Sequence, residues 1–189
     1  MATLRSFRAK PAPPAQPSLV VQTLLTLARQ RDGLSEPRCR TLLDLMETSG
    51  LVGVRIRGEL ARDGLTRIKF AVLLALFAID PVAASPSDLA LHTGASRPAV
   101  STALDGLTRR RLVSRAAGDP DRRVRYVTLT AAGRELIDRA ATRCLRLLGR
   151  IAQLLPVSAH SQLRLACALL QEGAAQCAEL DALTSPVSP

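Results

Sequence analysis

From Ser85 to Arg115 the chain reads SPSDLALHTGASRPAVSTALDGLTRRRLVSR, and two helix starts follow one another in this segment. Ser85, with a proline next to it and an aspartate three residues further on, has the pattern of a capped first turn, and this short helix ends at Gly94. Ser96 then caps a second helix that runs to about Arg110. Two short helices joined by a tight turn that contains glycine predict a helix-turn-helix.

The second of these helices has two different faces. Val100, Leu104 and Leu107 recur with helical spacing, which predicts that this side packs against a core. Near its start the other side carries short polar groups, a proline and one long cation: Ser96, Arg97, Pro98, Ser101 and Thr102. A helix about 10–12 Å across fits the major groove of DNA, where Arg97 could reach O6 and N7 of guanine and the hydroxyls could contact base edges or phosphates. An ordinary solvated helix face has the same pattern, so both interpretations stay open.

A turn and two β-forming stretches follow. Residues 112–116 and 124–129 favour strands, and the turn sequence GDPD lies between them. A hairpin directly after a helix-turn-helix predicts a winged helix. Arg122 and Arg123 follow Asp121 at the tip of this hairpin, where two cations suit phosphates or a minor groove, and a carboxylate can hold a neighbouring guanidinium in place. A turn that only increases solubility is the alternative.

Helical patterns extend on both sides of this segment. We expect helices at residues 18–31, about 38–62 and 65–79 before it, and at 130–155 and 158–183 after it. The predicted fold is therefore mainly α with a small β-hairpin wing, a winged helix-turn-helix domain flanked by N- and C-terminal dimerisation helices. The expected division is a disordered tail at 1–17, N-terminal dimerisation helices at 18–64, the DNA-binding domain at 65–129 and C-terminal dimerisation helices at 130–189.

Apolar stripes on the terminal helices predict a homodimer. Leu42, Leu45, Met46 and Val52 are expected to be buried on one side of the helix at 38–62. The last helix carries a further set: Leu163, Leu165, Leu169 and Leu170. These stripes are too extensive for a small winged domain to cover alone, and apolar patches of this kind mark interfaces. A two-fold dimer also matches a palindromic operator.

The composition points to a basic, helical protein. Apolar residues make up 47% of the 189 residues, enough for a sizeable core, whereas aromatic residues make up 2%, which argues against a single-strand binder that stacks bases. The formal net charge of +10 suits a polyanion, either nucleic acid or an acidic membrane surface. A genome that favours arginine codons would give the same charge, so charge alone does not decide.

Other classes of function lack their motifs. The cysteines at positions 39, 144, 167 and 177 form no CxxC pair, so we expect no metal and no cofactor, with thiols buried as small hydrophobic groups in a reducing cytoplasm. No stretch reaches the roughly 20 apolar residues of a membrane span, and no signal peptide or membrane partner is expected. The sequence also lacks a recognisable nucleophile motif and a phosphate-binding glycine loop, so we do not expect an enzyme.

Residues 85–115, followed by GDPDRRVRYVTLTAAGREL at 118–136, resemble the helix-turn-helix and wing of the MarR family of transcription regulators. The similar features are SRPAVS at the start of the second helix, LVSR on the first strand, and DPDRR with VTLTAAG at the wing and its exit. The preceding segment, which contains DGLT and F.VL, resembles the stretch of chain that leads into this domain in members of the family. The flanking helices match by arrangement alone.

The resemblance implies a cytoplasmic, ligand-responsive repressor that binds double-stranded DNA as a homodimer, with interleaved terminal helices. It implies that Asp121 braces Arg123 and that Arg123 enters the minor groove, but this wing is one residue shorter than the commoner form, which leaves Arg122 as the other choice. Family members often bind small anionic or phenolic effectors between the dimer helices and the winged domain. The alternatives are a winged-helix protein–protein module without specific DNA binding and a redox sensor.

A redox sensor would need a reactive cysteine, and Cys39 is the candidate. It stands between Arg38 and Arg40, and cations lower the pKa of a thiol. The aromatic partners found in oxidant-sensing members of the family are missing here, so we predict a structural thiol.

Overall fold

A computed structural model of the chain describes residues 16–115 and 126–184. The chain divides into two compact units, the first ending at Gly58 and the second beginning at Glu59. Nine elements follow one another in this part of the chain: α1 (Leu19–Arg29), α2 (Glu36–Ala61), α3 (Arg67–Ile79), α4 (Pro86–Thr93), α5 (Arg97–Arg109), β1 (Val113–Arg115), β2 (Val127–Leu129), α6 (Ala131–Ala152) and α7 (Val157–Thr184). The fold is mainly α with one β-hairpin, as predicted. Within the described ranges, no helix is long and apolar enough to span a membrane.

The first unit contains α1 and most of α2. Ser18 caps α1, because its hydroxyl accepts a hydrogen bond from the Val21 amide at 3.3 Å. Val21 and Leu25 are buried on α1. Both helices were predicted, with ends that differ by one or two residues.

The apolar stripe on α2 is not buried within the chain, so this expectation is wrong. Leu42 is 44% exposed and Met46 is 69% exposed, whereas Leu45 and Val52 are half-buried. Helical spacing reveals that one side is apolar, but burial also needs a second surface. Within the described part of the first unit, α1 alone supplies that surface, and it is short.

In the second unit, side-chain caps set the starts of the helices. Ser85 and Asp88 form a capping box: the Ser85 hydroxyl accepts from the Asp88 amide, and the Ser85 amide donates to the Asp88 carboxylate at 3.1 Å. Gly94 ends α4 in the left-handed conformation, with φ +62°, which costs glycine little. Ser96 and Thr130 cap α5 and α6. All these caps were predicted from the sequence.

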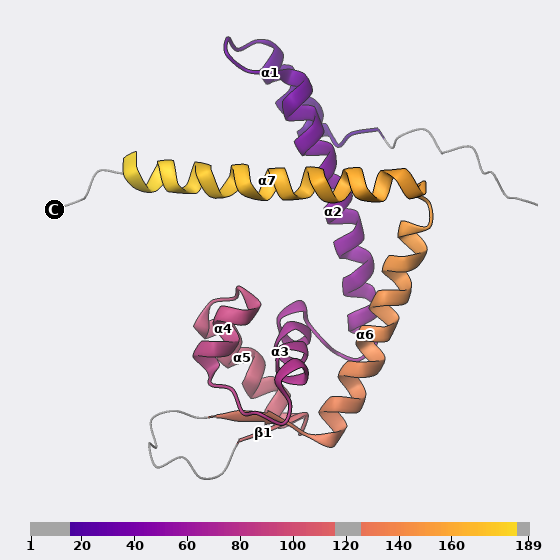
Figure 1. Cartoon of the computed structure of the whole chain (residues 1–189), viewed down its shortest axis with the longest axis vertical. Coiled ribbons are helices and arrows are strands. Elements are labelled where there is room, and N and C mark those ends of the chain that lie inside the picture. The colour runs from indigo at the N-terminus through magenta and orange to yellow at the C-terminus, as the bar shows by residue number, and fades with distance from the viewer. Residues whose placement is uncertain (1–15, 116–125, 185–189) are drawn as a thin grey trace, which may run out of the picture. The chain divides into compact units, whose positions relative to one another are not determined.

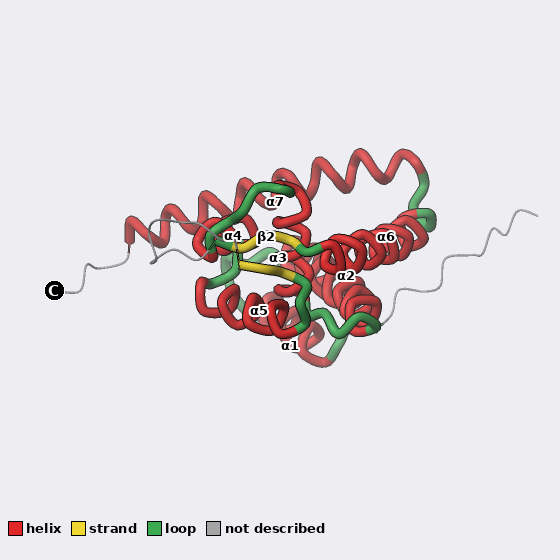
Figure 2. Tube along the Cα trace, turned by 90° about the horizontal axis from the view of Figure 1, so that it is seen from below, coloured by secondary structure: helices red, strands yellow, loops and turns green. Residues whose placement is uncertain are grey.

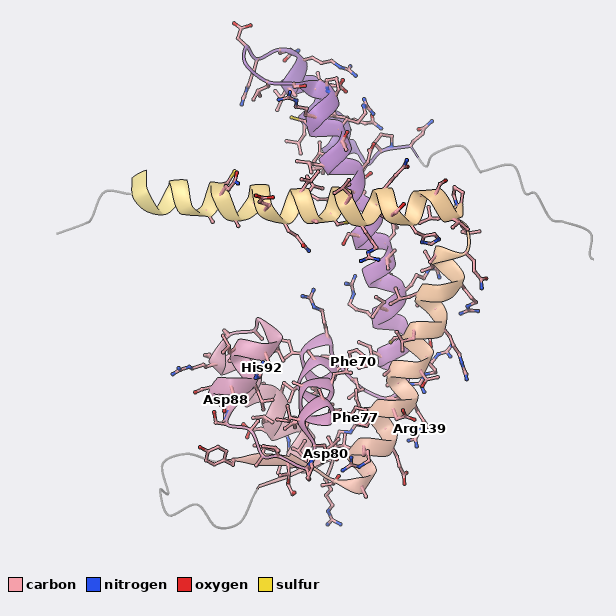
Figure 3. The ribbon with its side chains drawn as sticks, in the orientation of Figure 1. Phe70, Phe77, Asp80, Asp88, His92 and Arg139 are labelled. Atoms are coloured by element: carbon pink, nitrogen blue, oxygen red, sulfur yellow. The ribbon has the colours of Figure 1, made fainter. Side chains whose placement is uncertain are left out.

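α3 is the centre of the second unit. It contacts α4, α5, α6 and β2, and Figure 1 shows α3, α4 and α5 gathered above the hairpin. The largest fully buried side chains come from several of these elements: Leu73, Leu76, Leu89, Leu107 and Ile137. Phe70 and Phe77 lie on the side of α3 that faces α6 (Figure 3). This core holds α5 in place.

The hairpin pairs β1 with β2 in antiparallel register, with Val113 opposite Leu129. Ser114 and Thr128 share a side-chain hydrogen bond of 3.0 Å across the strands. Figure 2 shows the two strands running side by side next to α5. β1 starts one residue later than predicted, and the Leu112 carbonyl before it accepts hydrogen bonds from the amide and the hydroxyl of Thr130, the α6 cap.

Two helix ends also differ from the prediction. α3 begins at Arg67 instead of residue 65, because the Thr66 hydroxyl caps it by accepting from the Lys69 amide at 3.3 Å. α6 ends at Ala152, three residues early, since residues 153–155 form a turn before the proline. Neither difference moves the helix-turn-helix.

Candidate nucleic-acid interface

One side of α5 is locked into the core. Val100 and Leu107 have no exposed surface and Leu104 is 7% exposed, which confirms the predicted stripe. Ala103 and Gly106 are buried beside them. Because this stripe fixes the rotation of the helix about its own axis, the opposite face has one defined orientation.

The opposite face carries the side chains predicted to contact DNA. Arg97, Pro98, Ser101 and Thr102 are all exposed. Thr102 donates its hydroxyl proton to the Pro98 carbonyl at 3.0 Å, so its oxygen remains available as an acceptor. No large apolar side chain stands on this face in the first two turns. A polar surface of short side chains with one arginine suits close approach to base edges.

Ser96 has a structural role at the start of the same helix. Its hydroxyl accepts from the Ala99 amide at 3.4 Å, as an N-cap does. The N-terminus of a helix carries a partial positive charge, which favours an anion such as a phosphate. Ser96 therefore shapes the end of α5 that faces outward.

Arg67 is a cation that sequence reasoning missed. It lies at the first position of α3 and lines a cavity of about 510 Å³ together with Gly94, Ser96 and Ala99. This cavity joins the start of α3 to the start of α5. A basic residue directly after the Thr66 cap was the available signal, but nothing local in the sequence places the two helix starts side by side.

Two contacts hold α5 against its neighbours. Lys69 lies over Gly106, since a Cβ added to that glycine would stand 2.9 Å from the Lys69 Cε. Arg110, the residue after α5, donates to the Gly64 carbonyl at 3.2 Å. Arg110 therefore holds the end of α5 to the segment that precedes α3.

The tip of the hairpin lies outside the described residues, and so do Asp121, Arg122 and Arg123. The structure describes the hairpin as far as Arg115 on one strand and from Tyr126 onward on the other. The contribution of the wing to DNA binding stays a prediction.

Ionisable groups near the site serve the fold. Hydrogen bonds from the Ser85 hydroxyl and amide lower the pKa of Asp88. Burial raises the pKa of Cys144, which makes this thiol a poor nucleophile. Cys144 is buried as expected, but Cys39 and Cys167 are half-buried and Cys177 is exposed. Among the described side chains, no group of three or more potential ligands could hold a metal ion.

Comparison with known proteins gives one family match. Residues 63–124 match the model of the MarR family. The DNA complex of MepR from Staphylococcus aureus superposes with a TM-score of 0.61 at 19% identity, covering 68% of this chain and 94% of that one. A MarR-family transcriptional regulator from Silicibacter pomeroyi superposes with a TM-score of 0.51 at 25% identity, covering 77% of this chain and 91% of that one. The curated proteins contain no match.

Proposed function

The chain has the winged-helix fold of MarR-family transcription regulators, and from this premise we propose that it binds specific double-stranded DNA through α5. The observation that carries the proposal is the two-sided character of α5. Its buried stripe orients an exposed face on which Arg97, Ser101 and Thr102 stand together. That face has the size and the hydrogen-bonding groups to read a major groove.

The wing supplies the second contact in this proposal. Arg122 or Arg123 enters the adjacent minor groove, and Asp121 braces the inserted arginine. The net charge of +10 supports binding to a polyanion. The MepR structure was determined with DNA, which shows that a similar fold binds DNA in that protein.

A homodimer is part of the proposal. None of the described side chains of α7 is buried, and Leu165 and Leu169 are 63% and 60% exposed. Large apolar side chains that are exposed in the single chain favour contact with a second copy of the protein. Two copies related by a two-fold axis would place two α5 helices on the half-sites of a palindromic operator.

The regulatory outcome belongs to the same proposal. We infer a repressor whose affinity for DNA falls when a small effector binds. MepR, whose structure is similar, is described as a transcription regulator of a multidrug efflux pump.

Selection of bound fragments from the source genome tests the DNA-binding proposal. We expect recovery of a small set of fragments that share an inverted repeat, and we expect the fragments recovered by Arg97→Ala to lose their base preference at one symmetric position of that repeat. Asp105→Asn, an exposed change further along α5, is the matched control. Recovery of no fragments by the wild-type protein would favour the alternative, a winged-helix module that binds other proteins.

Redox sensing is the second candidate, because Cys39 is half-buried between Arg38 and Arg40 instead of lying deep in a core. The comparison of wild type with Cys39→Ser, before and after mild peroxide, separates the two. We expect both proteins to keep their affinity for the selected operator. Release of DNA by the oxidised wild type alone would establish the redox sensor.

A further inference from the structure

The first turn of α3 carries two cations to which the proposed function gives no role. Arg67 is the first residue of α3 and is exposed, and Lys69 follows two positions later and is half-buried. Among the described residues, neither side chain has a carboxylate within 4.0 Å. We call these two residues the α3 edge.

The helix itself gains nothing from the two charges. The first turn of a helix carries a partial positive charge, so cations placed there lower its stability slightly. No acidic residue in the first turn of α3 offsets this effect, whereas Asp88 occupies the first turn of α4. Residues that oppose the local preference of a helix without a compensating contact indicate a functional role.

Both cations lie beside α5. Arg67 lines the cavity of about 510 Å³ together with Ser96 and Ala99, at the start of α5. Lys69 lies over Gly106, since a Cβ added there would stand 2.9 Å from the Lys69 Cε and 3.1 Å from its Nζ. Ala99 and Gly106 are seven residues apart and therefore occupy the same side of α5. The α3 edge thus follows one side of α5 over about 10 Å.

This side of α5 borders the face that is proposed to read DNA. Thr102 follows Ala99 by three residues, so it stands about 60° away around the helix axis. Thr102 is exposed, whereas Ala99 is half-buried. A duplex in contact with the exposed face of α5 would therefore lie next to the α3 edge.

The hairpin lies at the opposite end of α3. After α3 ends at Ile79, the chain reaches Ala84, which pairs with Val127 of β2. Because α3 has 13 residues, its start is about 20 Å from that end. Figure 1 shows α3 running from its start towards the strands, and α5 packs against it. The α3 edge and the hairpin are therefore at different sides of α5.

This arrangement matches the phosphates of a duplex. A major groove about 12 Å wide is bounded by one sugar-phosphate strand on each side, so a helix in the groove has phosphates along both of its sides. On the basis of the proposed function of α5, we propose that the α3 edge binds the phosphates that bound the major groove on the side away from the wing. Arg67 contacts them near the start of α5 and Lys69 near its middle. Such contacts fix the register of the protein on DNA and carry no base preference.

Titration of two duplexes by fluorescence anisotropy at several salt concentrations tests the proposal. One duplex contains the operator recovered by fragment selection, and the other has a random sequence of the same length. The variants are Arg67→Gln and Lys69→Met, in which methionine keeps an unbranched apolar chain over Gly106. We expect each variant to weaken both duplexes by the same factor. In a dimer the slope of log affinity against log salt should become shallower by about 2 in each variant, at roughly 0.9 per phosphate contact.

Three further variants separate phosphate binding from other effects. Arg67→Lys keeps the charge and should keep the slope of wild type. Arg146→Gln/Arg150→Gln removes two exposed cations from the C-terminal half of α6, which lies away from α5 in Figure 1, and should also keep that slope. Its matched partner is Arg67→Gln/Lys69→Met, which removes the same charge from the α3 edge. In urea unfolding Arg67→Gln should be at least as stable as wild type, because a cation leaves the first turn of α3.

The outcomes distinguish this proposal from the proposed function. If both single variants keep the wild-type slope while Arg97→Ala loses its base preference, the α3 edge is overturned and the reading role of α5 stands. An equal change of slope in Arg146→Gln/Arg150→Gln would also overturn it, since total charge would then explain the binding. If wild type has no base preference but its slope depends on Arg67 and Lys69, the α3 edge stands and specific reading by α5 fails. Binding of neither duplex by wild type would overturn both.

Discussion

At the scale of single residues, Gly133 is the position at which the winged domain leaves the least room. A Cβ added there would overlap the Leu112 carbonyl oxygen and stand 3.1 Å from the Leu129 Cδ1 atom. A backbone carbonyl that also accepts the hydrogen bonds of Thr130 cannot move aside cheaply. We predict that Gly133→Ala lowers the free energy of unfolding by about 3 kcal/mol, the upper range for overpacking.

A matched glycine on the same helix gives the control for this change. Gly149 has open space at its Cβ, so Gly149→Ala should stabilise the protein by about 0.5–1 kcal/mol, the usual gain of alanine over glycine in a helix. Urea unfolding followed by circular dichroism measures both. Equal effects of the two substitutions would show that the packing of Gly133 against Leu112 is unimportant.

Arg97 is expected to read a base. It is exposed at the start of α5, and a bidentate contact with guanine contributes about 1–3 kcal/mol of discrimination. We therefore predict that Arg97→Ala flattens base preference at one symmetric operator position and changes nonspecific binding much less. A scan of single-base operator variants measures this. Uniform loss of affinity over all sequences would mean that Arg97 contacts only phosphate.

Arg123 is expected to act through charge and groove shape. Arg123→Ala should weaken specific and nonspecific DNA alike, and in a dimer two cations are lost. The slope of log affinity against log salt should then become shallower by about 2, at roughly 0.9 per contact. Arg122→Ala is the matched variant, since the shorter wing does not decide which of the two arginines enters the minor groove. A salt titration in which Arg122→Ala has the larger effect would reverse the assignment.

At the scale of elements, α4 depends on its capping box. The Ser85 hydroxyl accepts from one amide of the first turn, and Ser85→Ala should cost about 1 kcal/mol of stability. The box also implies a pH dependence. The pKa of Asp88 is lowered in the folded state, so its stabilising contribution is present above the ordinary aspartate range and is lost as pH falls through the lowered pKa.

The pH dependence is measured by comparison with Asp88→Asn. Wild type should be more stable than this variant at neutral pH, and the difference should shrink as pH falls below about 4, where aspartate protonates. Unfolding by urea at several pH values follows the difference. A difference that stays constant down to acidic pH would mean that the Asp88 charge does not support the cap.

Local signals made most of the elements predictable. Ser85, Ser96 and Thr130 cap helices where the sequence indicated, because a cap is a contact between residues three apart. The buried stripe of α5 was equally readable. The cation at Arg67 was missed, because its position beside α5 depends on how α3 packs, which is a long-range property.

At the scale of the whole molecule, the stripe on α2 shows where prediction from one chain fails. Its spacing predicted burial, but Met46 is 69% exposed in the chain as described. The periodicity of apolar residues identifies a face that favours burial and does not say whether the same chain or another molecule covers it. A second copy is the covering surface in the proposed dimer.

α7 offers the test of that dimer. Leu165 and Leu169 are four residues apart and stand on one face of the helix, with most of their surface exposed in the single chain. Leu165→Glu/Leu169→Glu would place two carboxylates in the proposed interface of each copy, where burying an unpaired charge costs several kcal/mol. We predict monomers by light scattering, with helix content close to that of wild type.

The control and a second variant make this prediction decisive. Gln171→Glu adds a carboxylate on the opposite side of α7 and should leave the dimer intact.

Deletion of residues 158–189 should give a monomer or an insoluble product, because it removes the apolar face altogether. A monomer presents one α5 helix to one half-site, so the glutamate variant should also bind a single half-site as well as it binds the full inverted repeat. A soluble, intact dimer after the deletion would show that the interface lies elsewhere in the chain.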